Sequence, residues 1–104
     1  MASSKAYLDF ILEQLSELDE ISHRAMMGEY IIYYQGKIVG GIYDDRLLVK
    51  PVKSAISLMP NATYEFPYRG AKEMLLVDDV DSKEFLTKLF DAMYQELPSP
   101  KEKK

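Results

Sequence analysis

The sequence predicts a two-layer α+β domain, in which N- and C-terminal helices cover one face of an antiparallel sheet. Segments with helical spacing of apolar residues lie near the two ends of the chain, and the central segment is rich in β-branched and aromatic residues. The 104 residues, 47% of them hydrophobic, are enough for one buried core and too few for two domains. The expected order is helix, four strands, short helix, one or two strands and final helix.

The first helix is predicted over residues 4–18, with Ser3 or Ser4 as its N-cap. Its apolar residues recur three and four positions apart, which is typical of a helix with one buried stripe. These residues are Tyr7, Leu8, Phe10, Ile11, Leu15 and Leu18. The acidic residues between them are expected to form a solvated face.

A four-stranded antiparallel meander is predicted from Ser22 onward, because β-branched and aromatic residues replace the helical spacing. Residues that favour chain reversal stand at Gly28, Gln35-Gly36 and Asp44-Asp45. Tight turns at the second and third of these places would set the register of the strands. The resulting pairs are Tyr33 with Ile38, Ile31 with Gly40, Ile42 with Leu47 and Gly40 with Val49.

This register divides the side chains of the meander between two faces, because cross-strand partners share a face and neighbours along a strand alternate. The face expected under the helices carries Ile31, Tyr33, Ile38, Gly40, Ile42, Leu47 and Val49. The face expected to stay open carries Tyr30, Ile32, Tyr34, Lys37, Val39, Gly41, Tyr43, Arg46, Leu48 and Lys50. A shift of one residue would exchange the faces. Gly40-Gly41 inside a strand indicates a bulge or a close backbone contact.

The remaining elements complete a single domain over residues 1–97. They are a short helix over 52–59, a short strand over 64–66, a strand over 73–77 and a final helix that begins after an Asp81 cap and ends at Leu97. Residues 98–104 are expected to form a charged flexible tail.

The residue inventory argues against an enzyme. There is no cysteine, and His23 is the only histidine, so a nucleophile with a base and an orienting group is not available. The acidic run at 78–81 lacks the glycine of a calcium loop, and neither a metal nor another cofactor is expected. No secretion signal or membrane-spanning run is present, which predicts a cytoplasmic protein without a membrane partner.

The open sheet face is the predicted functional surface. Its interaction residues are Tyr30, Ile32, Tyr34, Tyr43, Arg46 and Leu48, a mixture of aromatic, aliphatic and cationic side chains that is typical of protein interfaces. We expect a protein partner, or self-association as a homodimer. The alternative is nucleic-acid binding through a basic patch formed by Arg24, Lys37, Arg46 and Lys50. The net charge of −4 favours protein contact over a phosphate backbone.

Several short runs resemble the N-terminal domain of the TfoX (Sxy) family. They are Arg24-Ala25-Met26-Met27-Gly28, Tyr34-Gln35-Gly36-Lys37, Gly41 to Leu47 with Lys50, and Phe66-Pro67-Tyr68 with Gly70 and Met74, within a similarity from about Ile21 to Leu97. The resemblance implies a two-layer α+β fold and a non-enzymatic regulatory role, since family members are associated with the regulation of bacterial competence genes. Full-length regulators carry a second, helical domain, so we expect this chain to be a stand-alone copy of the first domain.

Overall fold

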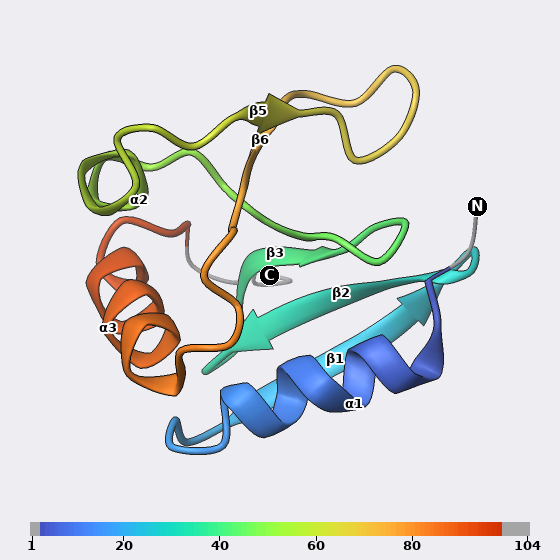
Figure 1. The fold of residues 1–104 in the computed structure, drawn as a ribbon, viewed down its shortest axis with the longest axis horizontal. Helices are drawn as coiled ribbons and strands as arrows, with labels where there is room; N and C mark the ends of the chain where they lie inside the picture. The colour runs from blue at the N-terminus through green and yellow to red at the C-terminus, as the bar shows by residue number, and fades with distance from the viewer. Residues whose placement is uncertain (1–2, 99–104) are drawn as a thin grey trace, which may run out of the picture.

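The computed structural model describes residues 3–98 and contains three helices and one six-stranded sheet (Figure 1). The elements in chain order are α1 (Lys5–Gln14), β1 (Ile21–Met26), β2 (Glu29–Tyr34), β3 (Lys37–Ile42), β4 (Leu47–Val49), α2 (Lys53–Leu58), β5 (Tyr64–Glu65), β6 (Met74–Leu76) and α3 (Lys83–Tyr94). The predicted fold class and order of elements are confirmed. The predicted tail lies, from residue 99 onward, outside the described residues.

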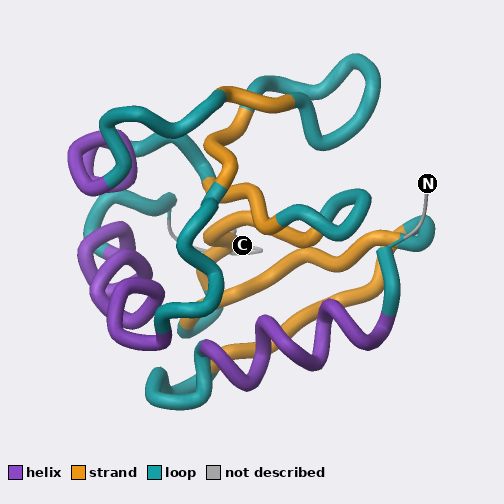
Figure 2. Tube along the Cα trace, viewed as in Figure 1, coloured by secondary structure: helices purple, strands orange, loops and turns teal. Residues whose placement is uncertain are grey.

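The sheet is antiparallel throughout, with the strand order β1-β2-β3-β4-β6-β5. One apolar core joins α1 and α3 to the same side of the sheet, and α2 packs beside α3 (Figure 2). From the helices the core takes Leu8, Ile11, Leu15, Leu86, Leu89, Phe90 and Met93, and from the sheet Ile32, Tyr34, Val39, Ile42, Leu47, Val49 and Leu75. The opposite side of the sheet is called here the open face.

The helices begin at serine caps. Ser4 Oγ accepts a hydrogen bond from the Tyr7 amide at 3.1 Å, and Ser82 Oγ accepts one from the Phe85 amide at 3.1 Å. The predicted Asp81 cap is therefore wrong by one residue. Helix α1 is shorter than predicted, because after Gln14 the chain tightens into turns that still bury Leu15 against the core. Apolar spacing alone does not separate such a turn from a continuing helix.

Each reversal in the meander is a two-residue turn with positive φ at both central residues. These residues are Met27 (54°) and Gly28 (85°), Gln35 (51°) and Gly36 (85°), and Asp44 (55°) and Asp45 (55°). Positive φ at both positions defines the turn whose twist matches the right-handed twist of the strands it joins. The predicted tight turns are thus confirmed, as are the pairs Tyr33 with Ile38 and Ile42 with Leu47.

A bulge in β3 overturns half of the predicted faces. Tyr33 pairs with Ile38, but Ile32 pairs with Gly40, so Val39 is an extra residue on β3. The extra residue reverses the alternation of faces between the two halves of the β2/β3 ladder. The core face therefore carries Tyr30, Ile32, Tyr34, Val39, Ile42, Leu47 and Val49, whereas Ile31, Tyr33 and Ile38 lie on the open face with Tyr43 and Leu48.

The bulge coincides with the two strand glycines. A Cβ atom on Gly40 would overlap the carbonyl oxygen of Leu48 on β4, and one on Gly41 would lie 2.5 Å from the carbonyl oxygen of Tyr30 on β2. The neighbouring backbones thus approach β3 too closely for any side chain at these positions. The sequence-based expectation of a bulge or close contact at Gly40-Gly41 is confirmed in both respects.

Candidate interaction surface

The six residues predicted as one interaction face do not lie together on an exposed surface. The exposed fraction is 0% for Ile32 and Leu48, 5% for Tyr34 and 7% for Tyr43. Tyr30, Ile32 and Tyr34 lie on the core face, because the bulge in β3 reverses the faces that two regular hairpins would give. The predicted exposed face is therefore wrong.

Tyr34 has a structural environment under α3. Its hydroxyl donates a 2.6 Å hydrogen bond to Asp91 Oδ1, and its ring lies 6.4 Å from the ring of Phe90 and 5.4 Å from that of Tyr94. Burial, followed by the hydrogen bond to the Asp91 carboxylate, raises the pKa of Tyr34 to about 12. The neutral phenol joins the sheet to α3 and is not available to a partner.

Tyr43 and Leu48 do lie on the open side, but the loop between β5 and β6 (residues 66–73, gold in Figure 1) contacts Tyr43 there. The ring of Tyr68 lies 6.2 Å from the ring of Tyr43, and Pro67 is buried. Burial, with the nearby Tyr68 as the next cause, raises the pKa of Tyr43 above its usual range. The loop thus partly covers the open face, and we call residues 66–73 the roofing loop.

The predicted basic patch is dispersed. Lys37 Nζ lies 4.0 Å from the ring centre of Tyr94 and donates to the Tyr94 carbonyl at 3.1 Å, on the helix side. Arg46 pairs with Glu65 at 2.8 Å and donates to the carbonyl of Phe66, so it holds β5 and the start of the roofing loop. Arg24 and Lys50 remain on the open side. The structure does not bring the four cations together.

A groove of about 510 Å³ lies between the open face and the roofing loop. We call it the open-face groove and define it by Met26, Ile31, Ile38, Tyr43, Tyr68 and Met74, with Lys50, Lys72 and Glu73 as charged residues in its lining. Its defining apolar residues come from β1, β2, β3, the turn after β3 and the 67–74 segment. Met26 and Ile38 are 40% and 38% exposed, and Tyr68 is 57% exposed.

Sequence reasoning placed Ile31 and Ile38 in the core and missed the groove. The signals that could have found it were the alternative assignment of faces, which a one-residue shift produces, and the aromatic run at 66–68. The contact of that run with Tyr43 joins positions 25 residues apart, which periodicity within one strand does not reveal.

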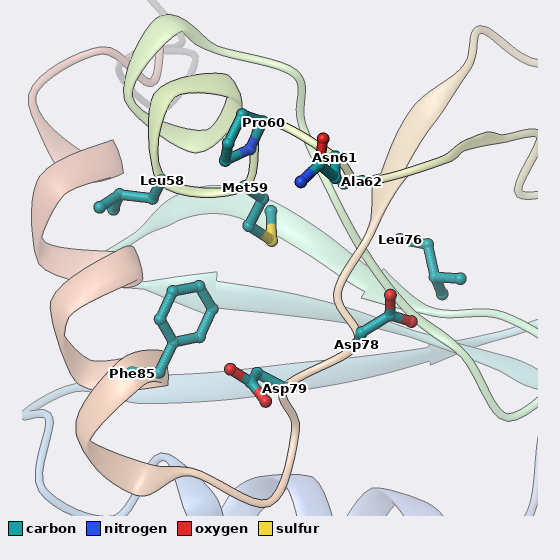
Figure 3. Close-up of a pocket in the computed structure, with 9 residues that line it drawn as sticks. All are labelled: Leu58, Met59, Pro60, Asn61, Ala62, Leu76, Asp78, Asp79 and Phe85. Carbon is teal, nitrogen blue, oxygen red and sulfur yellow. The ribbon is translucent and has the colours of Figure 1, made fainter.

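A second hollow of about 310 Å³ opens between the end of α2, the segment after β6 and the start of α3. Figure 3 shows Met59 and Phe85 directed into it, with the carboxylate of Asp79 at its lower edge. In residues 3–98 no group of three or more His, Asp or Glu side chains is arranged to hold a metal ion. The hollow therefore offers the carboxylates of Asp78 and Asp79, the side-chain amide of Asn61 and an apolar wall.

His23 is exposed on the edge strand β1. Its ring lies 6.1 Å from that of Tyr30 in an edge-on arrangement, and no hydrogen bond to its imidazole occurs among the described residues. It therefore lacks the nucleophile and orienting group that acid–base catalysis requires. No helix within residues 3–98 has the length and apolar composition needed to cross a membrane.

Comparisons with known proteins place this chain in a family. The family model described as the TfoX N-terminal domain matches residues 13–96. An uncharacterized 12.7 kDa protein from the trpE 5′ region of Spirochaeta aurantia is 31% identical over 105 residues, which cover 100% of this chain and 91% of that protein. No solved structure matches significantly. The chain therefore belongs to the TfoX N-terminal domain family.

Proposed function

We propose that this chain is a small non-enzymatic regulatory module that binds an extended, apolar and acidic segment of a partner protein in the open-face groove. The observation that carries the proposal is the concentration of exposed apolar side chains around this groove. Such patches on soluble domains mark sites of interaction, because their exposure to water is unfavourable.

The distribution of exposed apolar residues supports the choice of this surface. Eight large apolar side chains are exposed in the described part of the chain. Met26, Ile38 and Tyr68 line the groove, and Met27 and Phe66 adjoin the lining residues Met26 and Pro67 in sequence. Five of the eight are thus in or beside the groove. The helix-covered side contributes few, such as Phe10 on α1.

The shape and charge of the groove define the partner segment. A volume of about 510 Å³ is that of a few amino-acid side chains and falls within the range of pockets that hold small ligands. The lining carries two lysines, Lys50 and Lys72, against one acid, Glu73. Apolar anchor residues flanked by Asp or Glu would satisfy both properties, with the apolar groups desolvated at the centre and the charges at the rim.

Nucleic-acid binding has less support. Two of the four cations required for the basic patch are engaged within the protein, Lys37 with Tyr94 and Arg46 with Glu65. Releasing them for phosphate would cost the contacts that hold α3 and the roofing loop. Catalysis has no support from the groove, which contains no histidine or serine among its lining residues.

A peptide-selection experiment with two matched isoleucine variants tests the proposal. Ile38 in the groove and Ile56 on α2 are 38% and 40% exposed, so Ile38→Ser and Ile56→Ser remove similar exposed apolar groups. A random peptide library displayed on phage should give the wild-type chain ligands with apolar residues flanked by acids. Their affinity, measured by fluorescence anisotropy, should fall about tenfold in Ile38→Ser, equivalent to about 1.4 kcal/mol. It should be unchanged in Ile56→Ser.

Two results would reject the groove as the binding site. One is a selection that enriches no sequence above the level obtained with Ile38→Ser as bait. The other is an equal loss of affinity in both variants, with both still folded by circular dichroism.

A further inference from the structure

We propose that strand β1 pairs antiparallel with β1 of a second copy of this chain, so that two sheets join edge to edge. This inference does not depend on the groove, because it concerns the edge of the sheet and a different set of atoms. It commits to one register, centred on His23.

The outer edge of β1 is free among the described residues. β1 stands at the end of the strand order and pairs only with β2. Residues 22–26 are all exposed. The opposite edge, β5, has only two residues, whereas β1 has six. A long free edge is a template for another strand.

β1 also lacks most devices that protect an edge. Its sequence, ISHRAM, contains no proline, and its pairing with β2 runs without a bulge from Ile21 to Met26. Arg24 is the one residue of the strand with a permanent charge. An edge of six residues without a bulge and with a single cation therefore remains open to pairing, provided that the register keeps Arg24 away from its own copy.

Two observations fix which backbone groups face outward. The amide of Gln35 donates to the carbonyl of Glu20 at 2.9 Å, across the pair that continues the β1/β2 ladder. At the other end, Met26 and Glu29 flank the two-residue turn and so form a hydrogen-bonded pair. Because hydrogen-bonded pairs alternate, even-numbered residues bond to β2. Ile21, His23 and Ala25 therefore direct their amides and carbonyls toward the free edge.

Charge selects between the two symmetric registers that pair the most residues of the strand, those centred on His23 and on Arg24. A two-fold axis perpendicular to the sheet keeps the same face of both copies on one side, so residues of like parity must pair. Centring on Arg24 would set the two guanidinium groups directly opposite each other, which is unfavourable. Centring on His23 sets Arg24 opposite Ser22 of the second copy and Ile21 opposite Ala25. The second register avoids the repulsion.

This assembly has a consequence for the groove. Met26 contributes both to β1 and to the groove lining, and the two-fold axis leaves both open faces on one side of the joined sheet. The dimer would thus present two grooves in the same direction. Pairing of six-residue strands buries little surface, so the association should be weak and depend on concentration.

The first test measures mass against concentration for three chains by analytical ultracentrifugation. The wild type should rise toward twice the monomer mass as the concentration approaches the millimolar range. Ala25→Pro removes one outward amide without touching the bonds to β2 and should stay monomeric. Ala25→Ser keeps the amide and should behave as the wild type. A wild type that stays monomeric throughout, or an Ala25→Pro variant that still dimerises, would reject the edge pairing.

The second test determines the register from the rate of disulfide formation in variants with one introduced cysteine. The chain contains no cysteine, so a single introduced thiol can crosslink only with its own copy. In the His23-centred register, residue 23 faces itself with Cα atoms about 5.5 Å apart, a distance that a disulfide spans. Residue 22 meets its own copy only diagonally, at about 7–8 Å. His23→Cys should therefore oxidise to a dimer much faster than Ser22→Cys. Equal rates, or a faster Ser22→Cys, would overturn the register.

Discussion

The two faces of the sheet differ in what covers them. The core face lies under α1 and α3, and its apolar residues from β2 to β4 are almost completely buried apart from Tyr30, which is partly buried. The open face is partly covered by the roofing loop, which leaves a groove beside Tyr43. Both faces carry aromatic and aliphatic side chains, so composition does not distinguish them. The difference shows that the covering segment, and not the apolar content of a strand, decides which face is closed.

The largest contrast is expected between two phenylalanines, Phe90 in the core and Phe66 on the roofing loop. Phe90 is fully buried, and Phe90→Ala should lower the free energy of unfolding by about 3–5 kcal/mol. Phe66 is 57% exposed, and Phe66→Ala should change it by less than about 1 kcal/mol. Urea denaturation of both variants measures the two changes in free energy of unfolding. Similar losses would mean that the roofing loop is as closely packed as the core.

A smaller contrast is expected between two glycines. Gly40→Ala introduces an overlap with the backbone of β4 and should destabilise the fold by about 3 kcal/mol. Gly70, at φ +87° on the roofing loop, has no heavy atom near the position of an added Cβ. Gly70→Ala should therefore cost only the backbone strain, about 1 kcal/mol. Thermal unfolding of the two variants gives the order, and a harmless Gly40→Ala would contradict the close approach of β3 to β4.

Tyr34→Phe should cost about 1 kcal/mol, because it removes the hydrogen bond to Asp91. The pKa of Tyr34 is raised from 10.0 to about 12 in the folded protein, so this stabilisation is complete below pH 10 and is lost as the pH rises through 12. The difference in free energy of unfolding between the wild type and Tyr34→Phe, measured by urea titration, should decrease over that pH range. Tyr33→Phe, on the open face of the same strand, is the control. An advantage that does not change with pH would contradict the assignment.

The smallest effect is expected at the rim of the helix side. Glu96 after α3 accepts hydrogen bonds from the amide and hydroxyl of Ser54 at 2.8 and 2.9 Å, and these bonds lower the pKa of the Glu96 carboxyl. The stabilisation is present above the unfolded value of 4.5 and is lost as the pH falls through the lower folded value. Glu96→Gln should reduce the melting temperature slightly at neutral pH. The difference should disappear in acid, and a difference that grows there would have the wrong sign.

The sequence was sufficient for features that depend on neighbouring residues. Helical spacing located α1 and α3, and the turn residues at 35–36 and 44–45 located the hairpins and their closing pairs. These signals are local, because a turn or a helical stripe is encoded within a few positions. The fold class followed from their order.

The faces of β2 could not be predicted in the same way. Gly40 indicated a bulge or a close contact, but the side on which the extra residue falls depends on the approach of β4, which no local pattern reports. One extra residue moved Tyr30, Ile32 and Tyr34 from the predicted open face to the core. The predicted interaction face depended on that alternation and was therefore wrong. The fold class did not depend on it and was predicted correctly.

The succession of two-residue turns has a consequence for the order of folding. Because β1 to β4 are joined by the shortest connections that hairpins allow, their contacts close small loops at little entropic cost. The pairing of β4 with β6 must instead wait for α2 and the segment up to residue 73. We expect the amides of β2 and β3 to gain protection before those of β6 in pulsed hydrogen exchange during refolding. Simultaneous protection would mean that the whole sheet assembles in one step.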